Sequence, residues 1–323
     1  MLDLTRKELE DLVNQTIGQR FEPIHSQIER SSPPSIIGSL LHGVRSVESS
    51  ILDIAIERIG HRHVPLDWSD LGTLSTDEII ATAMMYSRGV DLLISGCIDA
   101  ETFGAGQECQ ELISKTIEIP FVGLGDEIYN SQSALSIVSE MYEQLGGLRE
   151  RRLVISWGFG SKFSLPNTAH SLVLLAASLG SEIRVVAPPE FSLLKRVIKS
   201  AVNRLEDSGG SIEETDQFEG ALKNADAVFG LNWASLENFH QPERNADRAR
   251  DYRDWFISHD ILDPKTLFMT EPPIEADLLA STAVINSERN LTLNWFAKRI
   301  QALMASISLV MSSYRDGLVR SLL

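Results

Sequence analysis

A loop rich in Gly and Ser, "GFGSKF", follows the apolar run "LVISW" and leads into the amphipathic stretch "PNTAHSLVLLAAS". A turn between a strand and a helix often binds a nucleotide phosphate through its backbone N–H groups. Here the third glycine of G-x-G-x-x-G is missing, GK[ST] does not occur, and no acidic residue ends the next apolar run, "EIRVVAP", to hold a ribose. The loop therefore indicates neither a dinucleotide site nor a Walker P-loop.

The elements that position this loop alternate along the chain. From residue 36 onward, short β-branched runs alternate with helical patterns such as "TDEIIATAMMYSRG" and "FSLLKRVIKSAVNRLED". The strand candidates are "SIIGSLL", "HVPLDW", "DLLISGCI", "IPFVGLG", "RRLVISWGF", "EIRVVAP", "SIEET", "DAVFGLNW", "TLFMTEP" and "AVINSE". This rhythm predicts an α/β fold with two parallel-sheet domains and the active-site cleft between them. Ligands of such sheets bind at the carboxyl ends of the strands.

The domain boundary is placed where the helical pattern "SQSALSIVSEMYEQLGGL" ends in two glycines and a charged "RERR" follows. An N-terminal domain spans 1–148 and is completed by a C-terminal helix at 290–323. The second domain spans 149–289. The long N-terminal helix at 4–29 and the C-terminal helix are expected to link the domains by packing on the first one.

The loop and its surroundings resemble the aspartate and ornithine carbamoyltransferase family, especially the branch that acts on N-acylated ornithines. The first match is "LVISWGFGSKFSLPNTAHSLVLLAASLG", and "DAVFGLNWASL" stands where the family has a strand that ends in Trp-Ala-Ser. Three further stretches match in order. They are "LFMTEPP" for His-Cys-Leu-Pro, "NSERNL" for Glu-Asn-Arg-Leu and "DEIYNSQSALS" for His-Pro-x-Gln. The resemblance covers nearly the whole chain and implies the family's two-domain fold, with a carbamoyl-phosphate-type first domain and an amino-acid-binding second domain.

Family members transfer a carbamoyl group from carbamoyl phosphate to an amine without a metal or cofactor. The resemblance places their phosphate-gripping Ser-Thr-Arg-Thr on Arg45, Ser46, Val47 and Glu48, followed by Ser49. The phosphate-binding arginine thus becomes Val47, and Glu48 would set a carboxylate against a phosphate, which costs several kcal/mol at an effective dielectric of ~20. The family's donor is therefore not expected here.

Other family positions are also changed. A second arginine aligns with Gly96, the His of His-Pro-x-Gln with Tyr129, and the Arg of Glu-Asn-Arg-Leu with Asn290. Arg289 can substitute for that last arginine after a one-residue shift, and Gln132 is unchanged.

On the acceptor side, the family's ornithine-binding Asp aligns with Leu231 and the Cys of His-Cys-Leu-Pro with Glu271. Asn167 keeps a position that meets the amino acid backbone, and His170 lies one turn on, so both are expected on one face at the start of the helix. The remaining residues expected to bind substrate are Asn232, Trp233, Ser235, Thr270 and Arg289.

Each candidate has a plainer interpretation that the sequence leaves open. Glu48 is either a cation-binding or general-base carboxylate or a helix-start acid that favours its own helix dipole. His170 is either an acid–base group or a partly buried helix histidine. Tyr129 and Gln132 either form a hydrogen-bonding pair for a carbonyl or cap the helix "SQSALS". Arg45 either restores positive charge to the donor pocket or is solvated.

The composition of the chain indicates which classes of partner and which location to expect. The 323 residues carry 45 acids against 29 bases, a formal charge of -16, which repels nucleic acid and favours solubility or a cationic substrate. No apolar run reaches the ~20 residues that a membrane-spanning helix needs. The start "MLDLTRKELE" is predicted to be a helix and not a signal peptide, and the two cysteines form no CxxC, so a cytoplasmic location is expected.

Metal binding is not expected. His61 and His63 have no accompanying carboxylate or thiolate cluster and are predicted to be exposed strand-end residues. Cys97 and Cys109 are predicted to be buried small apolar residues.

The sequence leaves two alternative functions open. The first is a transferase of this family that acts on an amino-acid-like, ornithine-like substrate with an altered donor or reaction. The alternative is a non-catalytic binding or regulatory homologue. New titratable groups at Glu48, His170 and Glu271 favour the enzyme. The family also implies a homotrimer, although "GTLSTDE" lacks the basic residue that a neighbour's loop usually donates.

Overall fold

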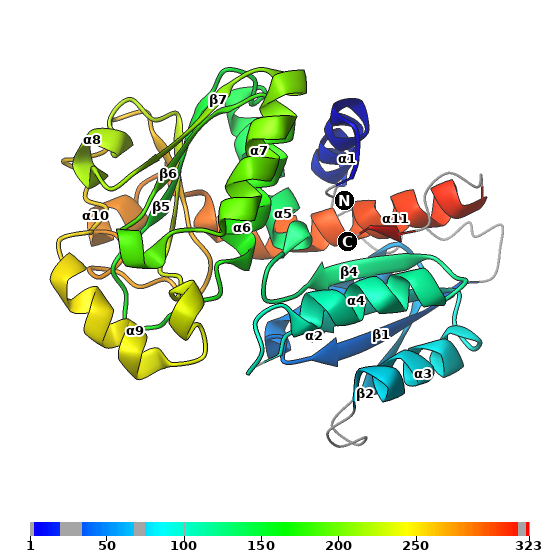
Figure 1. Ribbon diagram of the computed structural model, residues 1–323. Helices are drawn as coiled ribbons and strands as arrows, with labels where there is room; N and C mark the ends of the chain where they lie inside the picture. The colour runs from blue at the N-terminus through cyan, green and yellow to red at the C-terminus, as the bar shows by residue number, and fades with distance from the viewer. Residues whose placement is uncertain (1–2, 20–33, 68–74, 100, 316–320, 323) are drawn as a thin grey trace. The chain divides into compact units, whose positions relative to one another are not determined.

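The computed structural model of the protein describes residues 3–19, 34–67, 75–99, 101–315 and 321–322. The chain divides into two compact units (Figure 1). Unit 1 comprises Met1–Leu4, Asp11–Ser136 and Phe296–Leu323, and unit 2 comprises Thr5–Glu10 and Ile137–Trp295. The sequence placed the boundary after residue 148. The two units divide within α5 (Ser131–Leu145), whose first residues belong to unit 1 and whose last residues belong to unit 2.

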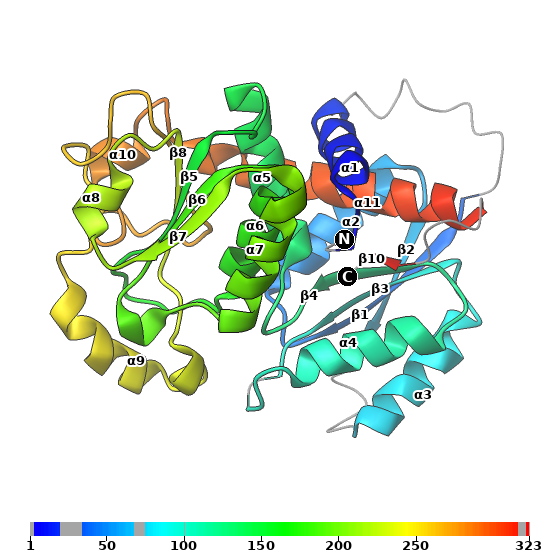
Figure 2. The same ribbon diagram turned by 45° about the horizontal axis from the view of Figure 1, so that its top comes forward.

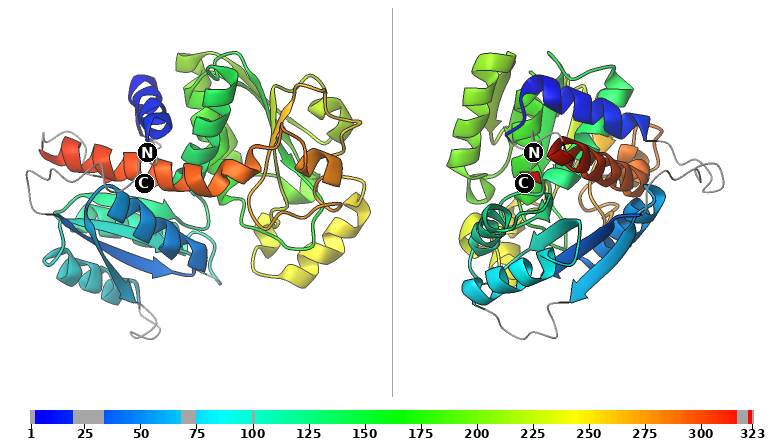
Figure 3. Two further views of the ribbon diagram at one scale, coloured as in Figure 1. Left: turned by 180° about the vertical axis from the view of Figure 1, so that it is seen from behind. Right: turned by 90° about the vertical axis from the view of Figure 1, so that its right-hand side faces the viewer.

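Unit 1 is built on a five-stranded parallel sheet of order β10-β4-β3-β1-β2. Its strands are β1 (Ile36–His42), β2 (Arg62–Asp67), β3 (Leu92–Cys97), β4 (Phe121–Gly125) and β10 (Ser321–Leu322). Its helices are α2 (Ser46–Arg58), α3 (Thr76–Ser87), α4 (Ala105–Thr116), most of α1 (Arg6–Gly18), the start of α5 and nearly all of α11 (Trp295–Arg315). Figures 1 and 2 show α3 and α4 side by side, and Figure 3 shows the length of α11.

Neighbouring residues of β1 show which helices cover each face of the unit 1 sheet. Leu40 packs in a cluster with Ala83 of α3 and Ile113 of α4. Ser39 points to the other face, where its Oγ lies 2.8 Å from His63 Nε2, and His63 Nδ1 in turn lies 2.5 Å from Asp53 of α2. Because strand side chains alternate, α3 and α4 cover one face and α2 the opposite one. These contacts leave the His63 side chain only 7% exposed, which corrects the expectation of an exposed strand-end histidine.

Unit 2 holds the second five-stranded parallel sheet, of order β7-β6-β5-β8-β9. Its strands are β5 (Arg152–Trp157), β6 (Glu182–Val186), β7 (Ser211–Thr215), β8 (Ala227–Leu231) and β9 (Leu267–Met269). Its helices are α6 (Asn167–Ser178), α7 (Lys195–Ser208), α8 (Phe218–Leu222), α9 (Pro242–Ala249), α10 (Thr282–Ile285) and the 3-10 turns η3 (Pro189–Phe191), η4 (Leu236–Asn238), η5 (Arg250–Tyr252) and η6 (Leu291–Asn294). The sequence thus predicted the two parallel-sheet α/β architecture correctly.

The chain order of the unit 2 strands creates a switch point. From β5 the chain builds outward through β6 and β7, and then returns to add β8 and β9 on the other side. The loops that follow β5 and β8 therefore leave neighbouring strands in opposite directions, which is where open parallel sheets bind ligands. Every residue of α6, the helix that follows β5, is buried, so the start of this helix is rigidly placed.

Three local expectations need correction. The run "AVINSE" is not a strand, because Ser281 accepts a hydrogen bond from the Val284 N–H and starts α10. Strand β10 was not predicted, because a strand of two residues is too short to show an alternating apolar pattern in the sequence. The N-terminal helix ends at Gly18, and the rest of the predicted span to residue 29 lies outside the described residues, as do residues 72–74 of "GTLSTDE". No helix in the described ranges is long and apolar enough to span a membrane.

Candidate functional site

The loops after β5 and β8 run together at the switch point of unit 2. The Ser164 N–H donates to the Asn232 carbonyl and the Ala234 N–H donates to the Ser164 carbonyl, both at 2.8 Å. Backbone bonds therefore hold the Gly-Ser-rich loop against the residues that follow β8, including Asn232, which the sequence assigned to substrate binding.

Asn232 carries polar groups that the protein leaves unused. The residue is 3% exposed, and within the described part of the chain neither its Nδ2 nor its Oδ1 has a hydrogen-bond partner. A Cβ atom on Gly160 would lie 2.7 Å from Asn232 Nδ2 and 2.4 Å from Glu275 Oε2, so a larger residue at this position would displace these two side chains. Glu275 is anchored by the Ser161 N–H at 2.9 Å and by the Ser161 hydroxyl. An unpaired buried amide costs about 1–3 kcal/mol, which marks Asn232 as a functional candidate.

The start of α6 and the end of β9 meet through a second polar contact. The Thr168 hydroxyl donates to Glu271 Oε1 at 3.3 Å, and the Asn167 side chain accepts the Thr168 N–H at 2.8 Å. Asn167 and Glu271 were both predicted to bind substrate, and the structure brings them to the same helix start. A carboxylate here is favoured by the positive end of the α6 dipole.

His170 is placed as a buried structural histidine. Its side chain is fully buried, and its Nε2 accepts a hydrogen bond of 3.1 Å from the Leu194 N–H at the start of α7. This geometry favours the plainer of the two interpretations left open by the sequence, because one ring nitrogen is already used as an acceptor and no solvent reaches the ring.

Four further residues expected to bind substrate are engaged inside unit 2. The Trp233 indole N–H donates to the Phe191 carbonyl at 2.7 Å, and Arg289 Nη1 donates to the Asp263 carbonyl at 2.7 Å. Ser235 and Thr270 are fully buried, and the backbone N–H groups of both are bonded within the unit. Their positions favour a supporting role beneath the loops.

In unit 1, Glu48 is the third residue of α2 and is buried among positive charges. One of its oxygens, Oε2, accepts a hydrogen bond from Nη2 of Arg299 on α11. The other, Oε1, lies 3.5 Å from Nη2 of Arg45, the residue that precedes α2. The side chains are 1% exposed in Arg299, 7% in Glu48 and 43% in Arg45. Glu48 is therefore neither a solvated helix-start acid nor an unpaired carboxylate, and the guanidinium it attracts belongs to the chain itself.

A second predicted residue of unit 1 also contacts α11. Gln132, near the start of α5, is 1% exposed, and its Oε1 accepts a hydrogen bond of 3.2 Å from the Ser306 hydroxyl. Its Nε2 has no partner within the described residues. Ser306 lies seven residues after Arg299, which places the two on the same face of α11. One helix face thus holds both Glu48 and Gln132.

The other residues predicted for the donor side differ in exposure and packing. Ser46 is exposed and Ser49 half-buried in the first turn of α2. Tyr129 is half-buried, and its backbone N–H and carbonyl close a turn with Asp126, each at 2.8 Å. At Gly96 an added Cβ would lie 2.8 Å from Val44 Cγ1, so the space that a side chain would occupy is filled.

Glu127, beside Tyr129, is a buried carboxylate that sequence reasoning overlooked. Its Oε1 accepts hydrogen bonds from the Asp99 N–H and, at 3.1 Å, from the Gly106 N–H in the first turn of α4. Burial raises the pKa of this carboxyl above its ordinary value, and the hydrogen bonds only partly oppose that shift. Glu127 therefore fixes the loop between β3 and α4.

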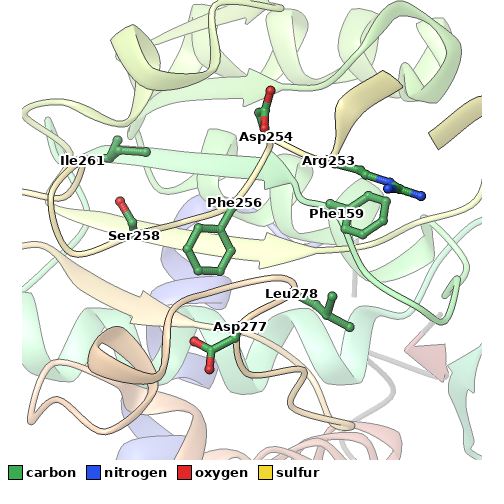
Figure 4. A pocket seen from close by; sticks show the side chains of 8 residues that line it. All are labelled: Phe159, Arg253, Asp254, Phe256, Ser258, Ile261, Asp277 and Leu278. Atoms are coloured by element: carbon green, nitrogen blue, oxygen red, sulfur yellow. The ribbon is translucent and has the colours of Figure 1, made fainter. Parts of the chain in front are cut away.

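The sequence-predicted site residues form no metal cluster within the described ranges, and they do not line the pocket found in unit 2. No group of three or more His, Cys, Asp or Glu side chains suited to a metal occurs in the described ranges. A hollow of about 600 Å³ follows the end of β5, where Phe159, Phe256 and Leu278 line it with Arg253 and Asp277 (Figure 4). None of the sequence-predicted site residues lines it. Both cysteines are buried and free, as predicted.

The sequence did not single out Arg299, Ser306, Thr168 or Glu275. Thr168 stood between two candidates and was detectable from its place at the helix start. Arg299 and Ser306 share only a seven-residue spacing on a predicted helix, which is typical of any buried helix face. No local sequence pattern indicates that Arg299 contacts Glu48, which lies 251 residues away.

The architecture is a two-domain α/β fold with two parallel sheets and polar side chains at the strand ends, and known proteins share it. The family model "Aspartate/ornithine carbamoyltransferase, Asp/Orn binding domain" matches residues 164–310. Ornithine carbamoyltransferase of Pyrococcus abyssi is 25% identical over 269 residues, 82% of this chain and 80% of that protein. The anabolic enzyme of Pyrococcus furiosus is 26% identical over 267 residues, 81% and 79% of the two chains.

Solved structures share the fold. Acetylornithine transcarbamylase complexed with acetylcitrulline superposes with a TM-score of 0.82 at 19% identity, covering 96% of this chain and 97% of that one. Ornithine carbamoyltransferase from Pyrococcus furiosus gives a TM-score of 0.81 at 22% identity, covering 96% and 95%. Residues 164–310 thus match the Asp/Orn binding domain of the aspartate/ornithine carbamoyltransferases, and nearly the whole chain shares the fold of the solved carbamoyltransferases.

Proposed function

We propose that this protein is a transferase that binds an amino-acid-like, ornithine-like substrate in unit 2 and uses a donor or reaction other than transfer from carbamoyl phosphate. The observation that carries the proposal is Glu48. It stands at the last position of the stretch that the family resemblance aligns with Ser-Thr-Arg-Thr, and it is buried and bonded to Arg299. The Glu48 carboxylate pairs with Arg299 and lies beside Arg45, so it competes with a dianionic donor for these guanidinium groups.

Two more observations support the altered donor. The position of the family's second arginine is Gly96, and Val44 fills the space beside it. Gln132, the one family residue kept on this side, already accepts a hydrogen bond from Ser306. No cofactor or metal is part of the proposal.

The acceptor side supports an amino-acid-like ligand. Asn167, Thr168 and Glu271 gather polar groups at the start of α6, where the Glu271 carboxylate can attract the amine of an amino-acid-like ligand. The unpaired amide of Asn232 adds a donor and an acceptor at the end of β8. Relatives of this chain are ornithine carbamoyltransferases, and one solved relative holds acetylcitrulline.

A non-catalytic binding or regulatory homologue is the second candidate. The observation that favours it is the burial of His170, whose ring is bonded to the backbone of α7 and offers no acid–base group to a substrate. A homologue of this kind keeps the amino-acid site without turnover.

Two measurements test the proposal. Purified protein is assayed for citrulline from ornithine and carbamoyl phosphate beside the Pyrococcus furiosus enzyme, and we expect no formation above the uncatalysed background. Thermal melting with a panel of amino acids should show stabilisation by an ornithine-like member, because a ligand of the folded state raises stability by mass action. Robust citrulline formation contradicts the altered donor, and a panel without effect contradicts the amino-acid site.

The family resemblance also leads us to propose a cytoplasmic homotrimer. Light scattering should give the mass of three chains, and a monomer mass would contradict it.

A further inference from the structure

Two guanidinium groups in unit 1 converge on a single carboxylate. Arg299 bonds to Oε2 of Glu48, and Arg45 reaches Oε1 at 3.5 Å, so each oxygen faces its own arginine. Arg299 is almost completely buried, with 1% of its side chain exposed, whereas Arg45 is 43% exposed. The carboxylate therefore links a deep cation to one that solvent can reach.

The buried guanidinium needs an anion. Arginine does not lose its proton in proteins, so Arg299 stays charged whatever surrounds it. A buried charge deprived of its partner destabilises the fold strongly, which means that this place in unit 1 demands a negative group. Glu48 supplies it from the third position of α2, where the helix dipole adds to the positive potential.

We infer that Glu48 is a built-in anion that fills a latent anion site formed by Arg299, Arg45 and the first turn of α2, and that its removal opens this site to inorganic phosphate. The inference rests on the proposed function for the view that the intact protein does not use a phosphate donor there. The inference explains why a phosphate donor is not used at this place: the guanidinium groups of Arg299 and Arg45 are present, but Glu48 of the same chain pairs with them.

The tetrahedral oxyanion suits the two arginines better than chloride does. Guanidinium groups bind phosphate oxygens through paired N–H donors, and charge-assisted bonds of this kind are roughly twice as strong as neutral ones. A phosphate in place of the carboxylate can face both Arg299 and Arg45, as Glu48 does with its two oxygens.

The experiment compares the intact protein with Glu48→Ala, Glu48→Gln and the double variant Glu48→Ala/Arg299→Met. Melting curves are recorded in inorganic phosphate and in chloride at equal ionic strength, and phosphate binding is measured by calorimetry. The Glu48→Gln variant keeps the side-chain shape and a carbonyl acceptor for Arg299, so it serves where Glu48→Ala does not fold. Asp53→Ala is the matched control, because Asp53 is an exposed acid of the same helix that pairs with His63.

We expect phosphate to leave the intact protein and Asp53→Ala unchanged relative to chloride. The Glu48 variants should melt at lower temperature, regain most of the loss in phosphate, and bind one phosphate at least about tenfold more tightly than the intact protein, a difference of about 1.4 kcal/mol. The double variant should not respond, because the buried cation is gone.

A Glu48 variant that is destabilised but indifferent to phosphate overturns the inference and leaves an ordinary buried ion pair. An intact protein that binds phosphate as tightly as its variants overturns it as well. Neither result depends on amino acid binding or turnover, so the inference can fail while the amino-acid site of unit 2 stands. Citrulline formation by the intact protein would instead contradict the proposed function.

Discussion

The Thr168 hydroxyl donates a hydrogen bond of 3.3 Å to Glu271, and this contact joins the first turn of α6 to the residues that leave β9. Both side chains are buried, so the contact is a fixed part of unit 2. It sets a carboxylate beside the positive end of a fully buried helix. The pair therefore fixes a polar group at the start of α6, where we propose the amino-acid site.

Replacing Glu271 by Gln should lower the free energy of unfolding by about 0.5–2 kcal/mol, because the charge that favours the α6 dipole is lost while the shape is kept. Urea unfolding measures this change. The control is Glu243→Gln, an exposed acid in the first turn of α9, where we expect less than about 0.5 kcal/mol. Equal effects at the two positions would show that Glu271 has no special relation to its helix.

Replacing His170 by Ala should destabilise the protein by about 1–3 kcal/mol through the unpaired Leu194 N–H, and the cavity left by the ring adds to this loss. His240→Ala, at an exposed histidine, is the comparison, and chemical denaturation serves for both. Similar stabilities for the two variants would mean that His170 is not the structural acceptor for the start of α7.

Much of the fold follows from the sequence because parallel sheets leave strong local patterns. Strands such as β3 and β8 are buried on both faces and read as continuous apolar runs between helical repeats. The run "AVINSE" was predicted as a strand, but a short β-branched segment also fits one helical turn. The Ser281 cap favours the helix over the strand. Local propensity does not report such a cap unless the turn itself is considered.

The site was predictable only in part. Family resemblance placed Asn167 and Glu271 at a helix start and a strand end, and the structure brings both to the start of α6, while their part in substrate binding stays a prediction. The partner of Glu48 was not predictable, because Arg299 lies 251 residues away and is brought to it by the packing of α11 on unit 1. Charge alone indicated that Glu48 attracts a cation, but the sequence does not tell whether a ligand or the chain supplies it.

Replacing Ser306 by Ala should cost about 1–3 kcal/mol, because Gln132 then loses the hydrogen bond that its buried amide makes to this residue, the one it has within the described ranges. The double variant Ser306→Ala/Gln132→Leu should recover much of that loss, since removing both polar partners leaves nothing unpaired. A double-mutant cycle by urea unfolding measures the coupling. Additive losses would contradict a direct contact between the two side chains.

Glu127 should make the stability of the protein depend on pH. Burial raises its pKa in the folded state above the ordinary 4.5, so the folded protein holds this proton more tightly than the unfolded chain does. The resulting stabilisation is complete below pH 4.5 and is lost as pH rises through the raised pKa. From pH 4.5 upward, the unfolding free energy should therefore fall relative to that of Glu127→Gln, by at most about 1.4 kcal/mol per pH unit.

Urea unfolding at a series of pH values checks this difference between the protein and its Glu127→Gln variant. The variant keeps one oxygen to accept the Asp99 and Gly106 N–H groups, so the loop between β3 and α4 should stay in place. Glu108→Gln, which removes an exposed acid from the first turn of the same helix, is the control for the loss of a charge near α4. A difference between the protein and Glu127→Gln that grows with pH, in favour of the protein, would mean that the hydrogen bonds to the carboxylate outweigh its burial, and the sign argued here would then be wrong.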